Sequence, residues 1–420
     1  MQLTEDDLYR SSTQFRKWSF TAQQLHAQRQ KTNLSATERV KANVARVRAQ
    51  RAQQAADSDS ISSGVDNCSG ASTPNVVTSA VEVNCLTAEE ELKIVNDFCE
   101  RAIALGTHNN FPSPVVPTCI QYMRRFYLYN SPMTYHVNII LRTIMYLATK
   151  VELCTVGHIN VGPFAEGAGR NVTTESILAP EYVIMQGLRY NLDVRHPFRG
   201  VKAGNMEMLE ILHGKYQGPS QGLKAAEVQA QMLQIPMKVN GPAMKMPANK
   251  VEERIHQAYS TATQTLRNVA VLTDAYFLYT PSQIWLAAHL LADEPLTLFY
   301  LNLKVPPSHP TYPKLLTTLR NCATLISSHR LYVYNTLPQA EKDAREAIHQ
   351  AEVKKLVQKL KNCRDPDKVD LVKLNQAQKR DAVEGGALEE SKAKRRKVAR
   401  ETYENEADAF WGPELANKAE

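Results

Sequence analysis

The sequence predicts an all-α protein built as a duplicated helical bundle. Strand signals are scarce, because no stretch sustains the period-two alternation of apolar and polar residues. Apolar residues instead recur at helical spacing along most of the chain. Two segments, 133–152 and 281–292, are apolar around nearly their whole circumference. Such a helix is usually central with others packed around it, so each half of the chain is expected to form one bundle.

The composition places limits on the class of protein. The chain has 420 residues, 43% of them hydrophobic and 22% charged, with a formal net charge of +7. This length exceeds one ordinary domain, and the charge is too mild to indicate nucleic-acid binding by itself. The seven cysteines are scattered without a Cys-x-x-Cys pair, which argues against a disulfide framework or a zinc site. We expect no metal or other cofactor and a reducing compartment.

The first residues argue against secretion and membrane insertion. The opening "MQLTEDDLYR" has acidic residues where a signal peptide needs basic and then apolar ones. No run of the chain approaches the roughly 18 apolar residues that a membrane span requires. We therefore expect a soluble, intracellular protein without a membrane partner.

Residues 1–55 are expected to form a docking segment followed by an amphipathic helix. The stretch "LYRSSTQFRKWSF" is too aromatic for a free tail. Ser35 and Glu38 have the spacing of a capping box, which predicts a helix over 36–54 with a valine stripe and a basic outer face. This helix could touch nucleic acid, but packing on the rest of the protein or on a partner protein is favoured. Residues 56–85, rich in Ser, Asn, Thr and Asp, are interpreted as a flexible linker.

Residues 86–195 are expected to form the first bundle and residues 196–335 the second. Thr87 with Glu90 and Thr280 with Gln283 are capping boxes that start one helix in each bundle. The segment "TTESILAPEYVIMQGLRYNL" is one helix or two short ones, because it contains a proline. The one-sided apolar positions of the central helix of the first bundle are Ile140, Ile144, Leu147, Ala148 and Val151.

The remaining segments are assigned from composition. Glycines and prolines mark residues 214–248 as an inserted loop, with a short helix around 224–234. A C-terminal helix is expected over 336–363. Residues 364–420 are charged and are expected to be disordered.

Three stretches, in order, resemble the cyclin family and in particular its cyclin H branch. They are "LYRSSTQFRKWSF" near the start, "MRRFYLYNSPMTYHVNIILRTIMYLATKVE" (123–152) and "LTDAYFLYTPSQIWLAA" (272–288). The similarity covers about 86–212 and 250–330 well, and the linker, the inserted loop and the tail poorly. It implies two tandem cyclin-box five-helix bundles with flanking N- and C-terminal helices.

The resemblance also implies a function. Cyclins of this kind bind and activate a cyclin-dependent kinase. The cyclin H branch partners the CDK-activating kinase and, with a RING-finger assembly subunit, joins the TFIIH core complex. That kinase phosphorylates other cyclin-dependent kinases and the C-terminal domain of RNA polymerase II. The chain would be a regulatory subunit without catalytic residues, and it contains no phosphate loop, His-Arg-Asp or Asp-Phe-Gly motif of its own.

The resemblance assigns a kinase interface to five residues. Lys150 matches a lysine at the end of the third helix of the first box, and Glu181 matches a glutamate on the fifth. Val151, Met185 and Tyr190 match apolar contact positions. Without the resemblance, Lys150 is interpreted as a solvated helix end, and the three apolar residues could equally belong to the ordinary core. Kinase catalysis needs the αC glutamate paired with the β3 lysine, so a partner that grips αC can shift the kinase to its active state.

A basic run near the end of the sequence suggests a compartment, and the sequence also allows functions other than that of a cyclin H. The run "KAKRRK" is interpreted as a nuclear-import signal, against a solvated charge cluster, and its basic residues are Lys392, Lys394, Arg395, Arg396 and Lys397. The alternatives are another transcriptional cyclin of the C, K or T type, a pseudo-cyclin scaffold, and a TFIIB-like DNA-binding factor. The last carries a zinc ribbon, for which this chain has no Cys-x-x-Cys.

Overall fold

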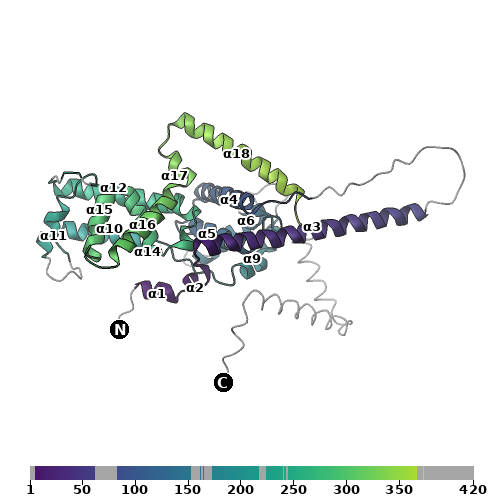
Figure 1. Cartoon of the computed structure of the whole chain (residues 1–420), viewed down its shortest axis with the longest axis horizontal. Coiled ribbons are helices and arrows are strands. Elements are labelled where there is room, and N and C mark those ends of the chain that lie inside the picture. The colour runs from purple at the N-terminus through teal and green to yellow at the C-terminus, as the bar shows by residue number, and fades with distance from the viewer. Residues whose placement is uncertain are drawn as a thin grey trace, which may run out of the picture. The chain divides into compact units, whose positions relative to one another are not determined.

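The computed structural model describes residues 5–61, 83–152, 173–216, 224–239 and 245–366, with the single residues 161, 164, 241, 242 and 372. The secondary structure in these ranges is helical, which confirms the all-α prediction (Figure 1). The chain divides into one unit at Met1–Val369 and another at Asp370–Glu420. The account below concerns the first unit. The predicted nuclear-import residues and most of the predicted tail lie outside the described residues.

Three helices form the N-terminal part: α1 (Glu5–Ser11), α2 (Thr13–Trp18) and α3 (Ala22–Ile61). The aromatic segment docks on the helical core, as its composition predicts. Only 1% of the surface of Trp18 is exposed, and its ring packs with Leu128 and Phe277. The backbone N–H of Phe20 donates to the carbonyl oxygen of Phe277 at 2.8 Å, which ties this segment to the second bundle.

The start predicted for the next helix, at Ser35, is wrong. Ser35 is exposed within α3, which begins thirteen residues earlier in a capping box that Thr21 forms with Gln24. The reason is that residues 22–61 contain no glycine or proline to interrupt a helix. The helix also continues past residue 55. The predicted valine stripe packs as expected, with Val40 fully buried and Val44 half-buried against the core.

The first bundle contains five described helices: α4 (Ala88–His108), α5 (Val115–Tyr129), α6 (Val137–Glu152), α8 (Thr174–Leu178) and α9 (Glu181–Gly187). The capping box of Thr87 and Glu90 starts α4, as predicted. Helix α6 is the central one, since it packs against α4, α5, α8 and α9. Its predicted apolar positions Ile140, Ile144 and Ala148 are fully buried.

The second bundle is arranged around α14 (Pro281–Ala292), which the capping box of Thr280 and Gln283 starts as predicted. Helix α14 packs against α10 (Phe198–Leu212), α12 (Ala248–Asn268), α15 (Glu294–Lys304) and α16 (Tyr312–Ser327). The remaining elements are α11 (Ala225–Met232), η1 (Ala270–Leu272), α13 (Ala275–Leu278), α17 (Arg330–Tyr334) and α18 (Gln339–Asn362). Helix α11 confirms the short helix predicted within the inserted loop. Its Val228 and Met232 are fully buried, so this insertion contributes to the core.

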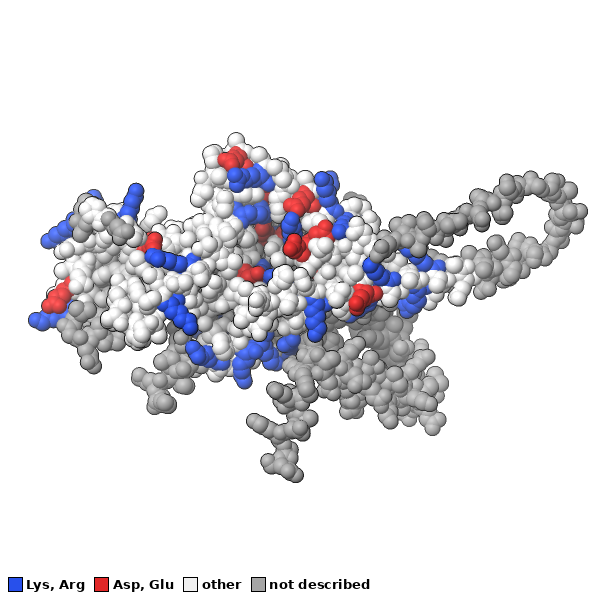
Figure 2. Space-filling view, viewed as in Figure 1, with Lys and Arg blue, Asp and Glu red and all other residues white. Residues whose placement is uncertain are grey.

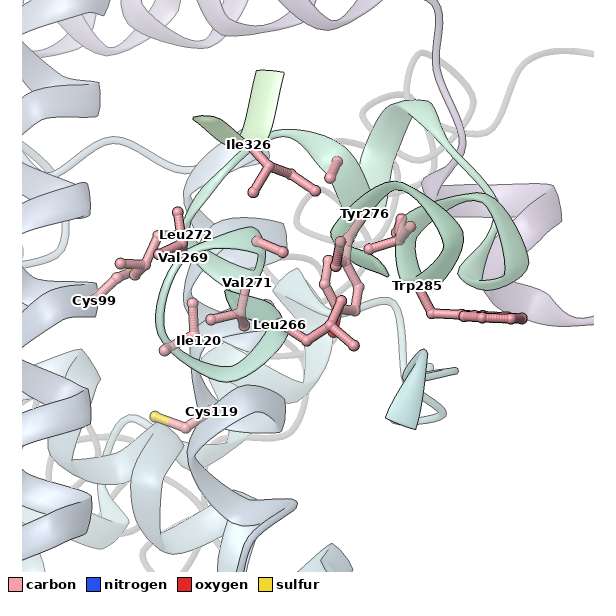
Figure 3. Close-up of a cluster of buried hydrophobic side chains, with 14 of the residues drawn as sticks. Cys99, Cys119, Ile120, Leu266, Val269, Val271, Leu272, Tyr276, Trp285 and Ile326 are labelled. Carbon is pink, nitrogen blue, oxygen red and sulfur yellow. The ribbon is translucent and has the colours of Figure 1, made fainter. Parts of the chain in front are cut away.

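The two bundles share one hydrophobic core. Cys99 and Ile120 of the first bundle belong to the same buried cluster as Val271 and Leu272 of the second (Figure 3). Burying these side chains removes apolar surface from water, and each Å² buried stabilises the fold by about 25 cal/mol. The bundles are therefore expected to stabilise each other.

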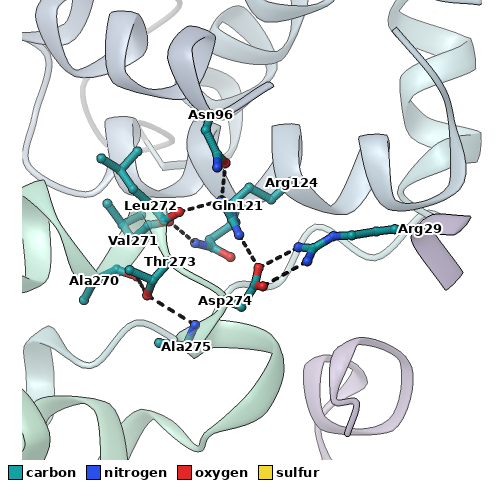
Figure 4. A network of polar contacts seen from close by, with 10 residues as sticks. All are labelled: Arg29, Asn96, Gln121, Arg124, Ala270, Val271, Leu272, Thr273, Asp274 and Ala275. Atoms are coloured by element: carbon teal, nitrogen blue, oxygen red, sulfur yellow. Dashed lines mark hydrogen bonds and ion pairs between the residues drawn. The ribbon is translucent and has the colours of Figure 1, made fainter. Parts of the chain in front are cut away.

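A polar network crosses the same junction (Figure 4). Arg124 on α5 donates to the carbonyl oxygen of Leu272 at 2.6 Å and pairs with the carboxylate of Asp274. Arg29 on α3 binds the same carboxylate with two hydrogen bonds of 2.9 and 2.6 Å. Two of the family-like stretches, "MRRF" and "LTDAYF", thus meet each other and the N-terminal helix.

The C-terminal helix α18 lies on α4. Lys359 pairs with Glu90 at 2.7 Å and Glu352 with Lys93 at 2.6 Å. Figure 2 shows acidic and basic side chains interspersed over this region. The chain then returns to the first bundle, where Asp365 is 1% exposed. Its N–H donates to the carbonyl oxygen of Met133 at 2.9 Å, and its Oδ1 accepts from the Asn43 amide of α3 at 3.0 Å. The packed part of the chain therefore extends beyond 363.

Candidate functional site

Lys150 and Glu181 are brought together where the last turn of α6 meets the first turn of α9. The Nζ of Lys150 forms an ion pair with the Glu181 carboxylate and lies 4.6 Å from the centroid of the Tyr146 ring. Pro180 occupies the N-cap position of α9, so the segment predicted to form one helix or two short ones forms two, α8 and α9. This puts the Glu181 carboxylate at the positive end of the helix dipole, where a negative charge is favoured.

The ion pair is accessible to a partner. The side chains of Lys150 and Glu181 are 39% and 27% exposed, respectively. An ion pair this open to solvent contributes only about 0–1 kcal/mol to folding stability. The fold gains little from holding these two charges here. They remain available as hydrogen-bond donors and acceptors for a second protein.

The three apolar positions of the expected interface differ in their burial. Val151 is half-buried, and Met185 is half-buried against the core. Tyr190 is 57% exposed, so the core interpretation is wrong for this residue. Val151 directly follows Lys150. Met185 lies one turn after Glu181 on α9, while Tyr190 follows the end of that helix. We call these three apolar residues the apolar border.

Sequence reasoning missed two exposed apolar side chains beside Glu181. Tyr182 and Leu178 are both exposed large hydrophobic residues. Tyr182 and Met185 lie three positions apart within α9, a spacing that places residues on one helical face, whereas Leu178 is the last residue of α8. The spacing could have identified Tyr182 but not Leu178.

The end of α9 has an unusual backbone. A Cβ atom at Gly187 would lie 2.6 Å from the Phe126 ring, so only glycine lets α9 approach α5 this closely. The next turn places Arg189 and Tyr190 in the left-handed region, at φ 53° and 54°. The N–H of Tyr190 donates to the carbonyl oxygen of Met185 at 2.9 Å. After this turn, the side chain of Tyr190 is exposed at the end of α9.

A partly buried hydrogen-bond relay connects the end of α6 to the second bundle. The hydroxyl of Thr118 donates to Glu152 at 2.6 Å, and Nε2 of His196 lies 2.8 Å from the same hydroxyl. Nδ1 of His196 lies 3.1 Å from the hydroxyl of Tyr276 in the second bundle. Burial lowers the pKa of His196 to about 3, so the ring is neutral. Since the Thr118 hydroxyl donates to Glu152, Nε2 carries the proton and Nδ1 accepts from Tyr276. Sequence reasoning did not find this relay.

Other kinds of site find no support in the described part of the chain. There, His, Cys, Asp and Glu side chains form no group of three that could hold a metal ion. Within the same residues, no helix is long and apolar enough to cross a membrane.

Comparisons with known proteins point to one family. Residues 196–327 match the family model described as the cyclin C-terminal domain. The chain is 28% identical over 305 residues to "Cyclin CCL1" of Saccharomyces cerevisiae. The aligned region covers 73% of this chain and 63% of that protein. It is 34% identical over 122 residues to "Cyclin-H" of Xenopus laevis, covering 28% and 38% of the two chains. The chain thus spans less than two thirds of the length of these curated relatives.

A solved structure agrees with them. A chain in the CAK complex of Chaetomium thermophilum bound to ATP-gamma-S matches with a TM-score of 0.64 and 27% identity, covering 93% of this chain and 99% of that one. The two helical bundles, each around a central helix, and the matched C-terminal domain make this chain a cyclin. Within the cyclins it belongs to the cyclin H family.

Proposed function

We propose that this chain is the cyclin subunit of a CDK-activating kinase, which phosphorylates other cyclin-dependent kinases and the C-terminal domain of RNA polymerase II. The observation that carries the proposal is the accessible ion pair of Lys150 and Glu181, together with the apolar border of Val151, Met185 and Tyr190 on the same helices and the turn that follows α9. The chain supplies no catalytic residue. It acts by binding the kinase.

The site suits a partner that must hold a kinase helix in place. Lys150 offers donors and Glu181 offers acceptors to the backbone of the segment that leads into the kinase αC helix. The apolar border supplies most of the binding free energy, while the charges fix the register of the partner. A cyclin that binds only the inward position of αC shifts the kinase toward its active state by the difference in affinity.

The same proposal includes two further partners and a compartment. A RING-finger assembly subunit joins the cyclin and its kinase, and the three associate with the TFIIH core complex in the nucleus. The support is the membership of the cyclin H family and the similarity to a chain of a CAK complex. The basic residues between 392 and 397 would act as the import signal.

The decisive experiment is charge reversal at Lys150. We expect Lys150→Glu to lower activation of the co-purifying kinase at least tenfold on a polymerase repeat peptide, because two carboxylates would then face the kinase segment. The melting temperature of the cyclin should change little, since exposed ion pairs contribute little to stability.

Lys304 offers a matched control. It also ends a helix, pairs with Glu207 at 2.6 Å and lies 5.4 Å from the Tyr300 ring, and these paired side chains are 36% and 44% exposed. Lys304→Glu should leave kinase activation unchanged. Equal losses of activation in both variants, or equal loss of fold and activation at Lys150, would reject the interface. Co-purification of DNA without a kinase, with binding that weakens steeply in salt, would favour the TFIIB-like alternative.

A further inference from the structure

The N-terminal segment contacts the end of α9 through the aromatic ring of Trp18. The ring of Trp18 lies edge-on to Tyr129, with ring centroids 5.9 Å apart. The guanidinium of Arg189 lies 4.2 Å from the Tyr129 centroid and 5.8 Å from the Trp18 centroid. The guanidinium of Arg125 lies 5.2 Å from the Trp18 ring. Trp18 and Tyr129 thus form an aromatic cage around Arg189.

This cage holds a backbone that is unfavourable by itself. Arg189 and Tyr190 are consecutive non-glycine residues in the left-handed region, where each residue costs roughly 1–2 kcal/mol. Such a conformation persists only when its surroundings fix it. The cage holds the side chain of Arg189, and the backbone of Arg189 leads directly to Tyr190. The orientation of Tyr190 therefore depends on the docking of a segment more than 170 positions earlier in the chain.

The indole of Trp18 does not act as a hydrogen-bond donor here. Its Nε1 is buried and has no hydrogen-bond partner among the described residues. Leaving such a donor unsatisfied costs free energy, so the indole N–H offers no advantage over phenylalanine at this position. What the position uses is the aromatic face, which attracts a guanidinium through the cation–π interaction.

We propose that Trp18 is a positioning residue for the kinase interface. It acts through Arg189, which fixes the left-handed turn that presents Tyr190 to the kinase. The inference rests on the proposed function of the same surface and adds a way to regulate it. Release of the N-terminal segment from the core would leave the Lys150–Glu181 ion pair in place and free Tyr190.

Two substitutions separate the aromatic face from apolar volume. Trp18→Phe keeps an aromatic ring against Arg189, whereas Trp18→Leu keeps only apolar bulk. With the co-purifying kinase as the probe, we expect Trp18→Leu to weaken binding about fivefold and Trp18→Phe less than twofold. Phe20→Leu is the matched control, because Phe20 belongs to the same segment and also packs on Phe277, whereas the rings that contact Arg189 are those of Trp18 and Tyr129. It should leave kinase affinity unchanged.

A double-mutant cycle tests the route of the effect. If Trp18 acts through Tyr190, the variant with both Trp18→Leu and Tyr190→Ala should bind the kinase no more weakly than Tyr190→Ala alone. Combined with Lys150→Glu, the effect of Trp18→Leu should multiply, because the ion pair lies outside the cage. Melting temperatures measured in parallel separate both effects from a general loss of stability.

Three results would overturn the inference: equal affinity losses for Trp18→Leu and Trp18→Phe, a loss for Phe20→Leu as large as for Trp18→Leu, or multiplying losses for Trp18→Leu and Tyr190→Ala. A failure of the proposed function has a different signature. In that case Lys150→Glu alone would leave kinase binding intact.

Discussion

At the scale of single residues, Glu91 is a buried carboxyl group that forms no ion pair with another of the described residues. It is buried on α4, and the Ser131 hydroxyl donates to its Oε1. Burial raises its pKa from 4.5 to about 7, although the hydrogen bonds from Ser131 and Asn33 act in the opposite direction. Near neutral pH this group therefore costs the fold some stability whenever it ionises.

The raised pKa makes a prediction with a definite sign. Because the folded protein holds the proton of Glu91 more tightly than the unfolded chain, its contribution to stability is complete below about pH 4.5 and is lost as pH rises through about 7. Glu91→Gln is neutral at every pH. We expect it to be more stable than the parent by about 1–3 kcal/mol at pH 8, with no advantage at pH 4.5. Urea unfolding at the two pH values measures this difference, and an advantage that is independent of pH would contradict it.

Single residues also show where sequence reasoning ends. The proximity of Lys150 and Glu181 could be anticipated from the resemblance, because that resemblance carries both positions. The partners of Arg124 could not, since Leu272 and Asp274 lie about 150 positions away and no local periodicity encodes the pairing. The His196 relay was missed for the same reason.

At the scale of elements, α3 contains two capping-box sequences, and only one of them marks the start of the helix. Thr21 with Gln24 and Ser35 with Glu38 both have the spacing of a capping box. Only the first acts as one, because the helix that it starts runs through the second without a breaker. A capping box predicts where a helix can begin, and the residues before it decide whether it does.

This difference can be measured as stability. Thr21→Ala removes the side-chain oxygen that accepts from the Gln24 N–H, so we expect a loss of about 1 kcal/mol in the free energy of unfolding. Ser35→Ala at the exposed middle of α3 should gain a few tenths of a kcal/mol, because alanine has the higher helix propensity. Urea unfolding of both variants checks this. If Ser35→Ala lowered the free energy of unfolding as much as Thr21→Ala, Ser35 would also act as a helix cap, contrary to this prediction.

Elements with strong one-sided or all-round patterns were predictable, and irregular connections were not. The central helices α6 and α14 follow from their apolar patterns, with a capping box marking the start of α14, and the short helix α11 was expected within the inserted loop. The left-handed turn at Arg189 and Tyr190 has no sequence signal, because neither residue is glycine or asparagine. It depends on contacts with Trp18 and Tyr129, which come from elsewhere in the chain.

At the scale of the whole molecule, the junction between the bundles depends on one carboxylate. Asp274 is bound by Arg124 and Arg29 at once, and these guanidinium groups neutralise it so well that its pKa falls below the usual value even though burial raises it. Arg124 itself is almost fully buried. Its charge is therefore stable inside the protein only while Asp274 is present.

Removing that carboxylate should destabilise the entire unit. Asp274→Ala leaves the buried charge of Arg124 without its counterion, so we expect a loss of about 3–5 kcal/mol in the free energy of unfolding. The control is Asp193→Ala, because Asp193 pairs with Arg195 on the surface. There we expect less than about 1 kcal/mol. Chemical unfolding monitored by circular dichroism compares the two, and similar losses would show that the junction does not depend on Asp274.

The hydrogen bonds of Asp365 have a consequence for synthesis of the chain. They join the carbonyl group of Met133 and the amide of Asn43, which is 322 positions earlier. A ribosome releases the chain from its N-terminus, so α3 and the first bundle emerge long before the residue that fastens them together. During that interval the surface of α4 that α18 will cover is exposed to solvent, and contacts between such distant residues form slowly. The nascent cyclin completes the contacts of its first bundle only after residue 365 has left the ribosome.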